Sequence, residues 1–424
     1  MRVVLVNRYF HPDESATSRM VSSLAFGLAA EGVEVEIVTG RYRHDDPRTA
    51  MPHRETIEDV AVHRIATSHF GRARLTGRAA DYASFHASVS LWCLAHVRRG
   101  DVVIACTDPP LLSVSLAAAL AVRGGLLVNW LHDVFPEVAI ELGMIERRSL
   151  VARLTLRMRD WSLRRAVRNV VPTLAMARGL RGRGIADETL AIVPYWSEEE
   201  EIRPVPASAN ALRREWGLDD RFVVGYSGNF GRAHEFLTLL DAAEALRGEP
   251  QIHFVLIGGG HGRAQVEAEI DRRGLTNIHL RPLQPRHRLA ESLSVADVHL
   301  VSLLPALEPY VIPSKLYGIM AAGRPVLFVG SREGEVAMTL RMHEFGHAVD
   351  IGQGLALAAK ISAVQANRLT CEAMGRNARQ AFESEHLRSR AVGEWLGLLG
   401  AMDAARVPSP ASAYSAGSDD TISD

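Results

Sequence analysis

Three short loops hold the backbone groups and side chains best suited to binding a phosphate. They are residues 227–232 (Ser-Gly-Asn-Phe-Gly-Arg), 258–262 (Gly-Gly-Gly-His-Gly) and 312–315 (Ile-Pro-Ser-Lys). Glycine allows the backbone to approach a ligand closely, and free amides at the start of a helix bind anions. Neither glycine loop matches the P-loop or the complete dinucleotide fingerprint, so each is a weak signal alone. Together they predict a phosphate-rich ligand at one edge of a sheet.

Lys315 is informative because the chain uses arginine almost everywhere else. Of the 48 basic residues, only Lys315 and Lys360 are lysine. We expect Pro313 to be the first residue of a helix that ends before Pro325, so that Lys315 lies in the first turn, where the helix dipole disfavours a cation. A bound phosphate would explain this position, since a compact ammonium approaches a phosphate oxygen as a point charge. The alternative is an incidental lysine at a helix start.

Two pairs of ionisable residues in the first half of the chain are candidates for catalysis. His11 and Asp13 follow the first predicted strand, and His132 and Asp133 follow a fully apolar run at 126–131. Open α/β sheets bind ligands at the carboxyl ends of their strands, which favours a site at both places. The alternatives are a loop that merely carries surface polar residues for His11 and Asp13, and a hydrogen-bonded loop histidine for His132.

A recurring βα pattern must position these candidates. The first unit is a strand at 3–7, a helix at 19–31 and a strand at 33–39. Such units build a parallel sheet with helices on its faces, so we predict the α/β class. The pattern restarts after residues 194–210, where three prolines and a run of acidic residues indicate a domain boundary.

The composition argues against several classes of protein. A net charge of −1 is untypical of a nucleic-acid-binding protein, and three distant cysteines without CxxC spacing indicate neither a disulfide framework nor a zinc site. The longest apolar stretch has about twelve residues, too few to span a bilayer. The chain enters a predicted strand almost at once, so we expect a cytoplasmic protein without a signal peptide.

A basic stretch from Arg147 to Arg168 suggests contact with a membrane. It carries eight arginines against one acidic residue, Asp160, with apolar residues in between: Leu150, Leu154, Leu156, Met158, Trp161 and Leu163. Basic helices with an apolar side lie on anionic membrane surfaces. A packed helix with solvated arginines is the alternative. Further upstream we expect a mobile basic stretch at 68–78 and a helix at 81–99.

Four of these segments together resemble the group 1 (family 4) glycosyltransferases of GT-B fold. They are residues 313–325, 226–233, 132–137 and the first strand with Phe10-His11-Pro12. The resemblance covers nearly all of residues 1–400 and looks closest to the branch that builds bacterial surface polysaccharides. It implies two Rossmann-like, doubly wound domains that face a cleft.

The resemblance also implies a division of the chain. The expected parts are an acceptor-binding domain at 1–195, a linker at 196–210, a nucleotide-sugar-binding domain at 211–380 and a carboxyl-terminal helix at 381–402 that crosses back to the first domain. Residues 403–424 are rich in Ser, Ala, Pro and Asp and are expected to be disordered.

The implied activity is transfer of a sugar, with retention and without a metal ion or cofactor, from a nucleotide-sugar donor to a saccharide or polyprenyl-linked acceptor. The donor diphosphate would be held by two glycine loops and the residues before the late helix: Gly228, Asn229, Gly231, Arg232, Gly258, Gly260, Ser314 and Lys315. His132 would face the donor sugar, with Asp133 beside it, and His11 and Asp13 would lie near donor or acceptor. The departing phosphate would itself take the acceptor proton.

The sequence departs from the family pattern at four positions. The two glutamates of the Glu-x7-Glu motif fall on Tyr310 and Gly318, and the arginine and lysine of the glycine loop fall on Asn229 and His234. We therefore expect Arg232 and Lys315 to be the phosphate cations. A nucleotide-sugar epimerase of the same architecture and a non-catalytic nucleotide-sugar-binding subunit are the competing hypotheses.

Overall fold

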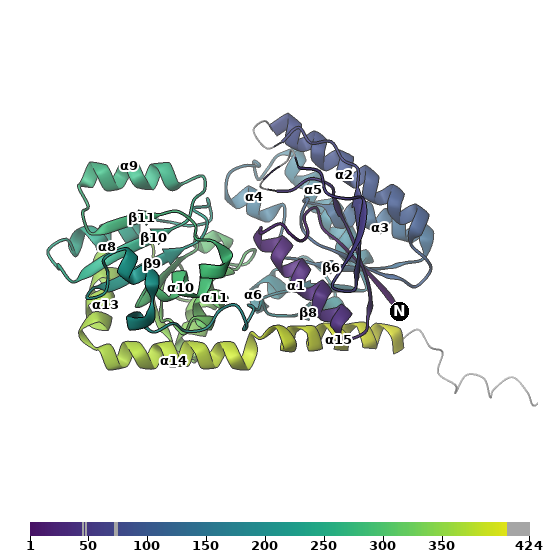
Figure 1. Ribbon diagram of the computed structural model, residues 1–424. Coiled ribbons are helices and arrows are strands. Elements are labelled where there is room, and N and C mark those ends of the chain that lie inside the picture. Colours follow the sequence, from purple (N-terminus) through teal and green to yellow (C-terminus); the bar gives the residue numbers. More distant parts are fainter. Residues whose placement is uncertain (45, 47–48, 72–74, 405–424) are drawn as a thin grey trace, which may run out of the picture.

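The computed structural model describes residues 1–44, 46, 49–71 and 75–404. They form two domains side by side, with two long helices at the carboxyl end running beneath both (Figure 1). Each domain is a mainly parallel sheet with helices on its faces. The predicted α/β class is therefore confirmed.

The first domain contains an eight-stranded sheet with the order β3-β4-β2-β1-β5-β6-β7-β8, parallel except where β3 meets β4. The strand order reverses between β1 and β5, so their carboxyl ends form a switch point of the kind that binds ligands. The strands are β1 (Arg2–Val6), β2 (Glu34–Gly40), β3 (Arg54–Ile57), β4 (Val60–Ile65), β5 (Val102–Ala105), β6 (Leu126–Trp130), β7 (Arg168–Val171) and β8 (Leu190–Ile192). The helices are α1 (Ala16–Ala30), α2 (Leu75–His96), α3 (Leu112–Arg123), α4 (Glu137–Glu141), α5 (Leu150–Arg165) and α6 (Leu174–Arg181).

The second domain contains a six-stranded parallel sheet with the order β11-β10-β9-β12-β13-β14, and its switch point lies between β9 and β12. The strands are β9 (Phe222–Ser227), β10 (Ile252–Ile257), β11 (Ile278–Arg281), β12 (Val298–Ser302), β13 (Val326–Val329) and β14 (Gly346–Val349). The helices are α7 (Ala211–Glu215), α8 (Leu237–Ala245), α9 (Arg263–Arg273), α10 (Leu289–Ser294), α11 (Lys315–Ala321), α12 (Glu335–Met342) and α13 (Gly354–Ala366). Strand β9 is buried along its whole length, as expected for a strand covered on both faces.

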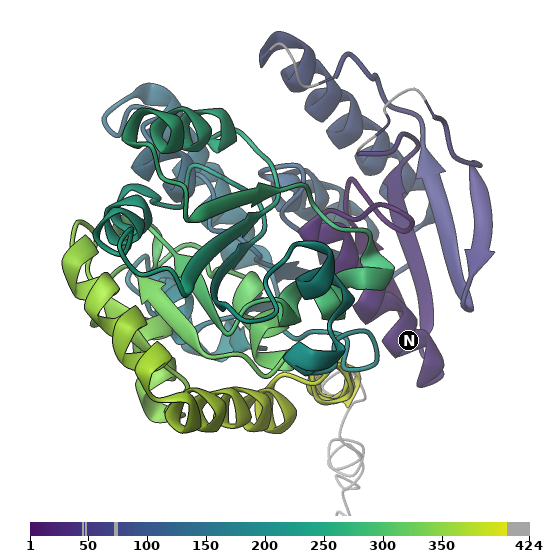
Figure 2. The same ribbon diagram turned by 60° about the vertical axis from the view of Figure 1, so that its left-hand side comes forward.

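Two helices form the carboxyl end of the described chain. Figure 2 shows α14 (Arg368–Glu385) along the edge of the second domain, and α15 (Arg388–Ala404) continues to the first. The helices α1 and α15 lie so close that a Cβ at Gly27 would overlap the Val392 side chain. We expected one helix at 381–402. The structure has the end of α14 there, then a break after Glu385, and then α15 from Arg388. Residues 403 and 404 of the expected disordered tail belong to α15, and residues 405–424 lie outside the described residues.

Helix α2 differs from the prediction. It begins at Leu75, whereas we expected a mobile stretch up to residue 78 and a helix only from residue 81. The buried Asp81 explains the difference, because its carboxylate accepts hydrogen bonds from the Ser68 hydroxyl at 2.8 Å and the Phe70 amide at 2.9 Å. These bonds tie the preceding loop to the helix. Residues 72–74 lie outside the described residues.

Across the described parts of the chain, none of the helices combines the length and the apolarity needed to pass through a bilayer.

Candidate active site in the cleft

The two glycine loops and Lys315 come together at the switch point of the second domain. A Cβ added at Gly228 would lie 3.3 Å from Lys315 Cε, and a Cβ at Gly258 would overlap the carbonyl oxygen of Gly228. A Cβ at Gly260 would likewise overlap the Asn229 side chain. Gly258 also has a φ of +136°, which favours glycine. Five of the predicted donor residues therefore form one cluster.

The ammonium group of Lys315 is enclosed by this cluster. Its Nζ donates a hydrogen bond to the Tyr226 hydroxyl at 2.6 Å, and Tyr226 donates in turn to the Asn229 carbonyl at 2.7 Å. Loss of solvent lowers the pKa of Lys315 to about 7. The nearby His234, whose Nε2 lies 3.4 Å from Nζ, is neutral because burial, with a smaller contribution from Lys315, lowers its pKa to about 4. The site thus holds a lysine that needs an anion to keep its charge.

The start of the helix that carries Lys315 differs from the prediction. Helix α11 begins at Lys315 itself, so Pro313 precedes the helix and is not its first residue. Ser314 stands at the N-cap and is exposed, and its side chain makes no capping hydrogen bond. Arg232 is exposed as well, and its guanidinium lies 3.3 Å from the ring of His261 in the second glycine loop.

Position 318, where the family glutamate is missing, is partly buried beside apolar side chains. A Cβ at Gly318 would lie 3.4 Å from Leu293 Cδ1 and 3.7 Å from Ile202 Cδ1. A glutamate here would begin in contact with these two apolar side chains, which offer its carboxylate no hydrogen bond. In this chain, glycine therefore fits the packing of α11 against the linker.

His132 lies at the carboxyl end of β6 and is 4% exposed. Its Nδ1 is 2.9 Å from the Tyr195 hydroxyl, and that hydroxyl donates to the His132 carbonyl at 3.2 Å. Burial lowers the pKa of His132 to about 3, so the ring is neutral at physiological pH. It can accept or donate a hydrogen bond, but it cannot supply a positive charge.

Asp133 opens into a cavity of about 330 Å³ on the first domain. Desolvation by the surrounding protein, and to a lesser extent the Asp108 carboxylate, raises the pKa of Asp133 to about 6. The cavity is lined by residues from α1, from α2 and from the segments after β5 and β6: Thr17, Arg78, Tyr82, Thr107, Asp108, Pro110 and Asp133. It is a polar recess at the switch point of the first sheet.

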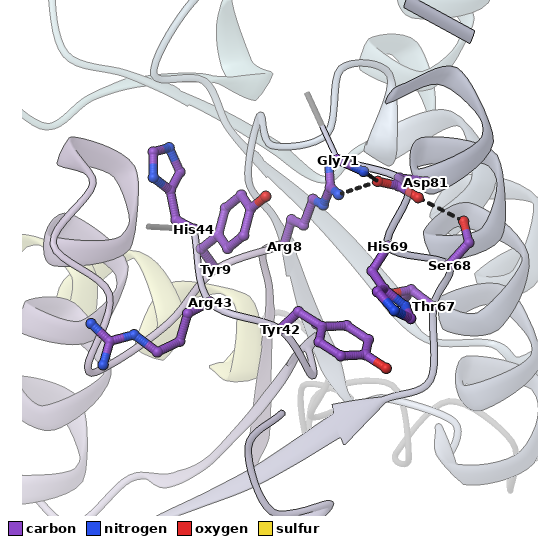
Figure 3. A pocket seen from close by; sticks show the side chains of 11 residues that line it. Arg8, Tyr9, Tyr42, Arg43, His44, Thr67, Ser68, His69, Gly71 and Asp81 are labelled. Carbon is purple, nitrogen blue, oxygen red and sulfur yellow. Dashed lines mark hydrogen bonds and ion pairs between the residues drawn. The ribbon is translucent and has the colours of Figure 1, made fainter. Parts of the chain in front are cut away.

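A second cavity, of about 130 Å³, lies at the ends of β1, β2 and β4 (Figure 3). In Figure 3, Arg8 points toward Asp81, with which it forms an ion pair of 3.5 Å. The Arg8 guanidinium also lies 4.9 Å from the centre of the Tyr82 ring, which lines the first cavity, so these side chains form a wall shared by both. The rings of Tyr42 and His69 are stacked 4.3 Å apart at this cavity.

His11 and Asp13 help to hold the loop after β1. The carboxylate of Asp13 is buried and accepts a hydrogen bond from the His44 amide at 2.7 Å. The His11 ring packs edge-on against Phe26 at 5.8 Å, and burial lowers its pKa. The structure thus gives Asp13 a role in shaping the loop that the sequence alone did not indicate.

Direct contacts join the two domains, and none of them was predicted from the sequence. The Glu335 carboxylate, at the start of α12, accepts hydrogen bonds from the Leu174 and Ala175 amides at 3.0 and 2.7 Å, the free amides at the start of α6. The Val134 amide donates to the Tyr310 carbonyl at 2.9 Å. Glu335 belongs to no recognisable motif. Its only signal in the sequence is its position as an acidic residue in the first turn of α12.

Two facing Rossmann-like domains with a crossing carboxyl-terminal helix define the GT-B fold. Two family models match the chain, "Glycosyl transferase 4-like domain" over residues 15–196 and "Glycosyl transferases group 1" over residues 208–381. The chain therefore belongs to the group 1 glycosyltransferases, and the predicted family and fold are confirmed.

Three known proteins illustrate the similarity. The putative colanic acid biosynthesis glycosyl transferase WcaI of Escherichia coli is 24% identical over 381 residues, which cover 86% of this chain and 90% of that protein. Sucrose-phosphate synthase from Thermosynechococcus elongatus matches with a TM-score of 0.75 at 17% identity and covers 95% of this chain and 99% of that chain. Anabaena HepE in complex with UDP and glucose matches with a TM-score of 0.71 at 16% identity, covering 95% and 100%.

Proposed function

We propose that this glycosyltransferase moves a sugar from a UDP-linked donor to a saccharide acceptor on a lipid carrier, in the synthesis of a bacterial surface polysaccharide. The convergence of both glycine loops on the enclosed Lys315 carries this proposal. The complex of HepE with UDP and glucose supports the choice of donor, and the name of WcaI supports the pathway.

Lys315 supplies the positive charge for the departing diphosphate. Its ammonium is already positioned by Tyr226, and it acts where negative charge develops as the glycosidic bond breaks. We propose that this charge replaces a metal ion. Because His132 is neutral and buried, we further propose a front-face reaction in which the leaving phosphate takes the acceptor proton and the anomeric configuration is retained.

The acceptor would lie over the two cavities of the first domain. The first cavity brings the Asp133 carboxylate to the cleft, and the second adds the aromatic face of Tyr42 and the polar Arg8 and Asp81. Aromatic rings beside planar charged groups suit a sugar, which has an apolar face and a rim of hydroxyls. An acceptor of more than one sugar unit would occupy both cavities.

Helix α5 provides the surface for the membrane that carries the acceptor. Five large apolar residues are exposed along the helix: Leu150, Val151, Leu154, Met158 and Trp161. Exposed arginines surround them at positions 147, 148, 153, 157, 164 and 165. This pattern matches a helix lying in an anionic interface. We therefore propose a cytoplasmic protein that binds peripherally to the inner face of the cell membrane.

Not every member of the predicted basic stretch belongs to this surface. Arg159 is buried and paired with Glu137 and with Asp160, its Nε lying 2.9 Å from the Asp160 carboxylate. Leu163 is fully buried in a cluster that includes Leu131. They point inward because the helix has only one exposed side.

The proposed function is tested by thermal shift with UDP-, GDP-, dTDP- and CMP-linked sugars, followed by NMR of the reaction with the donor that stabilises the protein. Transfer or slow donor hydrolysis with retained configuration is expected. A new epimer of the donor without any acceptor would indicate an epimerase. Donor binding without transfer or hydrolysis would indicate a non-catalytic subunit, and either result would overturn the proposal.

A further inference from the structure

A third cavity, of about 510 Å³, lies at the edge of the second sheet where its strands begin. Its floor includes Phe222, the first residue of β9, and Asp297 and Pro325, which come directly before β12 and β13. The two glycine loops follow the carboxyl ends of β9 and β10 in the same parallel sheet. The cavity therefore lies at the opposite edge from these loops and is separate from the proposed donor site.

The walls of this cavity come from the two segments that join the domains. One wall is the linker, which contributes Pro204 and Pro206, and the other is α14, which contributes Arg379 among others. The Arg379 Nη1 donates hydrogen bonds to the carbonyl of Ile202 in the linker at 3.2 Å and to that of Ala321, the last residue of α11, at 2.6 Å. A ligand in the cavity would thus touch both connecting segments.

The charges that line the cavity leave an excess of arginine. The arginines are Arg324, Arg368, Arg376 and Arg379, and the carboxylates are Asp297, Glu372 and Glu383. Asp297 already forms an ion pair of 3.2 Å with the fully buried Arg213, and lies 4.0 Å from Arg368, while Glu383 pairs with Arg379 at 2.7 Å. Glu372 alone is left to balance the remaining arginines, so the cavity favours an anion.

Arg324 brings a charge to the cavity without an ion pair to any carboxylate of the described residues. Its Nη2 donates to the carbonyls of Val205 and Ser294 at 2.7 and 3.0 Å, and its Nε is buried and has no hydrogen-bond partner in the described parts of the chain. Burial lowers the pKa of Arg324, and the Asp297 carboxylate offsets only part of this effect. Because a guanidinium stays charged in proteins, an anion in the cavity would stabilise it.

We propose that this cavity binds a small phosphate monoester, such as a sugar phosphate, at a second ligand site separate from that of the donor. Guanidinium groups bind phosphate oxygens in pairs, and this geometry suits the arginines of α14. Pro204, Pro206 and Phe222 give the body of the ester an apolar wall. The volume also fits an ester better than a free phosphate, because small-molecule sites have about 300–1,000 Å³. The proposal does not depend on the identity of the donor.

The ligand class is tested by isothermal titration calorimetry of the full chain with glucose 6-phosphate, ribose 5-phosphate, glycerol 3-phosphate and inorganic phosphate. At least one ester should bind about tenfold more tightly than inorganic phosphate, because its body adds contacts with the apolar wall. Lys315→Met should bind that ester as the wild type does, since the cavity lies at the other edge of the sheet. The proposal is refuted if no ester binds, if inorganic phosphate binds equally well, or if Lys315→Met loses the binding.

Substitutions of exposed residues locate the ester in the cavity. Arg368→Ala and Arg376→Ala should each weaken its binding about tenfold, because each removes a charge-assisted hydrogen bond. Glu372→Gln removes the opposing carboxylate and should tighten binding about two- to fivefold. Arg272→Ala, on α9 outside the cavity, is the control and should bind as the wild type. All four residues are exposed, so the melting temperatures without ligand should stay close to the wild-type value. Unchanged binding in both α14 arginine variants, or weaker binding in Glu372→Gln, would contradict the proposal.

Discussion

Replacing Lys315 by methionine should weaken donor binding and, at the same time, stabilise the protein without ligand. The enclosed ammonium has its pKa lowered from 10.5 to about 7 by loss of solvent. A shift of this size means that the amine at this position lowers the free energy of unfolding by about 4 kcal/mol at pH 7. Losing a charge-assisted hydrogen bond to the diphosphate costs about 1.5–3 kcal/mol, or at least about tenfold in donor affinity. Activity should fall by a similar factor or more.

The same lysine makes donor binding depend on pH. The diphosphate of a nucleotide sugar is fully ionised at neutral pH, and beside Lys315 it raises the pKa of the ammonium. Free Lys315 is protonated below about pH 7 and neutral above it, whereas in the complex it stays protonated. Donor affinity should therefore be constant below about pH 7 and fall about tenfold per pH unit above it, until the pKa of the bound form is reached. Neither neighbour interferes, because the pKa of His234 is lowered to about 4 and that of Tyr226 is raised.

Isothermal titration calorimetry with UDP-glucose, in buffers that differ in protonation enthalpy, measures this proton directly. Uptake should approach one proton above about pH 7 in the wild type and be absent in Lys315→Met. The matched control is Lys360→Met, which removes the only other lysine, an exposed residue on α13, and should behave as the wild type. The reasoning is refuted if wild-type affinity does not change with pH, or if Lys315→Met binds the donor normally and unfolds at a lower temperature.

Three further predictions concern other parts of the molecule. Leu154→Glu on α5 should abolish flotation with phosphatidylglycerol vesicles, while Met342→Glu at an exposed site on α12 should not; equal flotation of both variants would argue against the α5 surface. Gly258→Ala places a Cβ on the Gly228 carbonyl, so it should lower the melting temperature and weaken UDP-glucose binding at least about tenfold. Gly259→Ala is the control: its Cβ meets no atom within 4 Å, and the variant should be neutral in both measurements. Because the pKa of Asp133 is raised to about 6, turnover should fall as the pH drops through that value. Asp133→Asn should lose this pH dependence. An Asp133→Asn variant with the wild-type pH profile would show that another group titrates.

The fold and the meeting of the glycine loops were predictable because their signals are local. Apolar runs of strand length alternate with helical patterns along most of the chain, which predicts parallel sheets with helices on their faces. Lys315 could be found from its rarity, and the glycine loops from their composition. The partners of Lys315 could not, since Tyr226 and His234 come from other elements and meet it only in the folded domain.

Several features that the sequence did not show have a common physical cause, which is pairing between residues that are far apart in the sequence. The sequence predicts Arg159 to be a surface cation, but in the structure it is paired with Glu137, 22 residues earlier in the chain. Asp13 stays a catalytic candidate, and the sequence did not show that its carboxylate accepts a hydrogen bond from the amide of His44, 31 positions away. Likewise Tyr195 carries no motif, and its link with His132 spans 63 residues.

The crossing of α15 to the first domain determines where the chain can be cut for recombination with a relative. Trp395 is fully buried in the same apolar cluster as Val3 and Trp130, so α15 belongs to the first domain in space although it follows the second in sequence. A chimera made with a single junction in the linker at 196–210 would give the first domain a foreign last helix and leave that cluster mismatched. An exchange of second domains therefore needs two junctions, one in the linker and one at the break between α14 and α15. The second domain of a relative would then be a cassette inserted into an intact first domain.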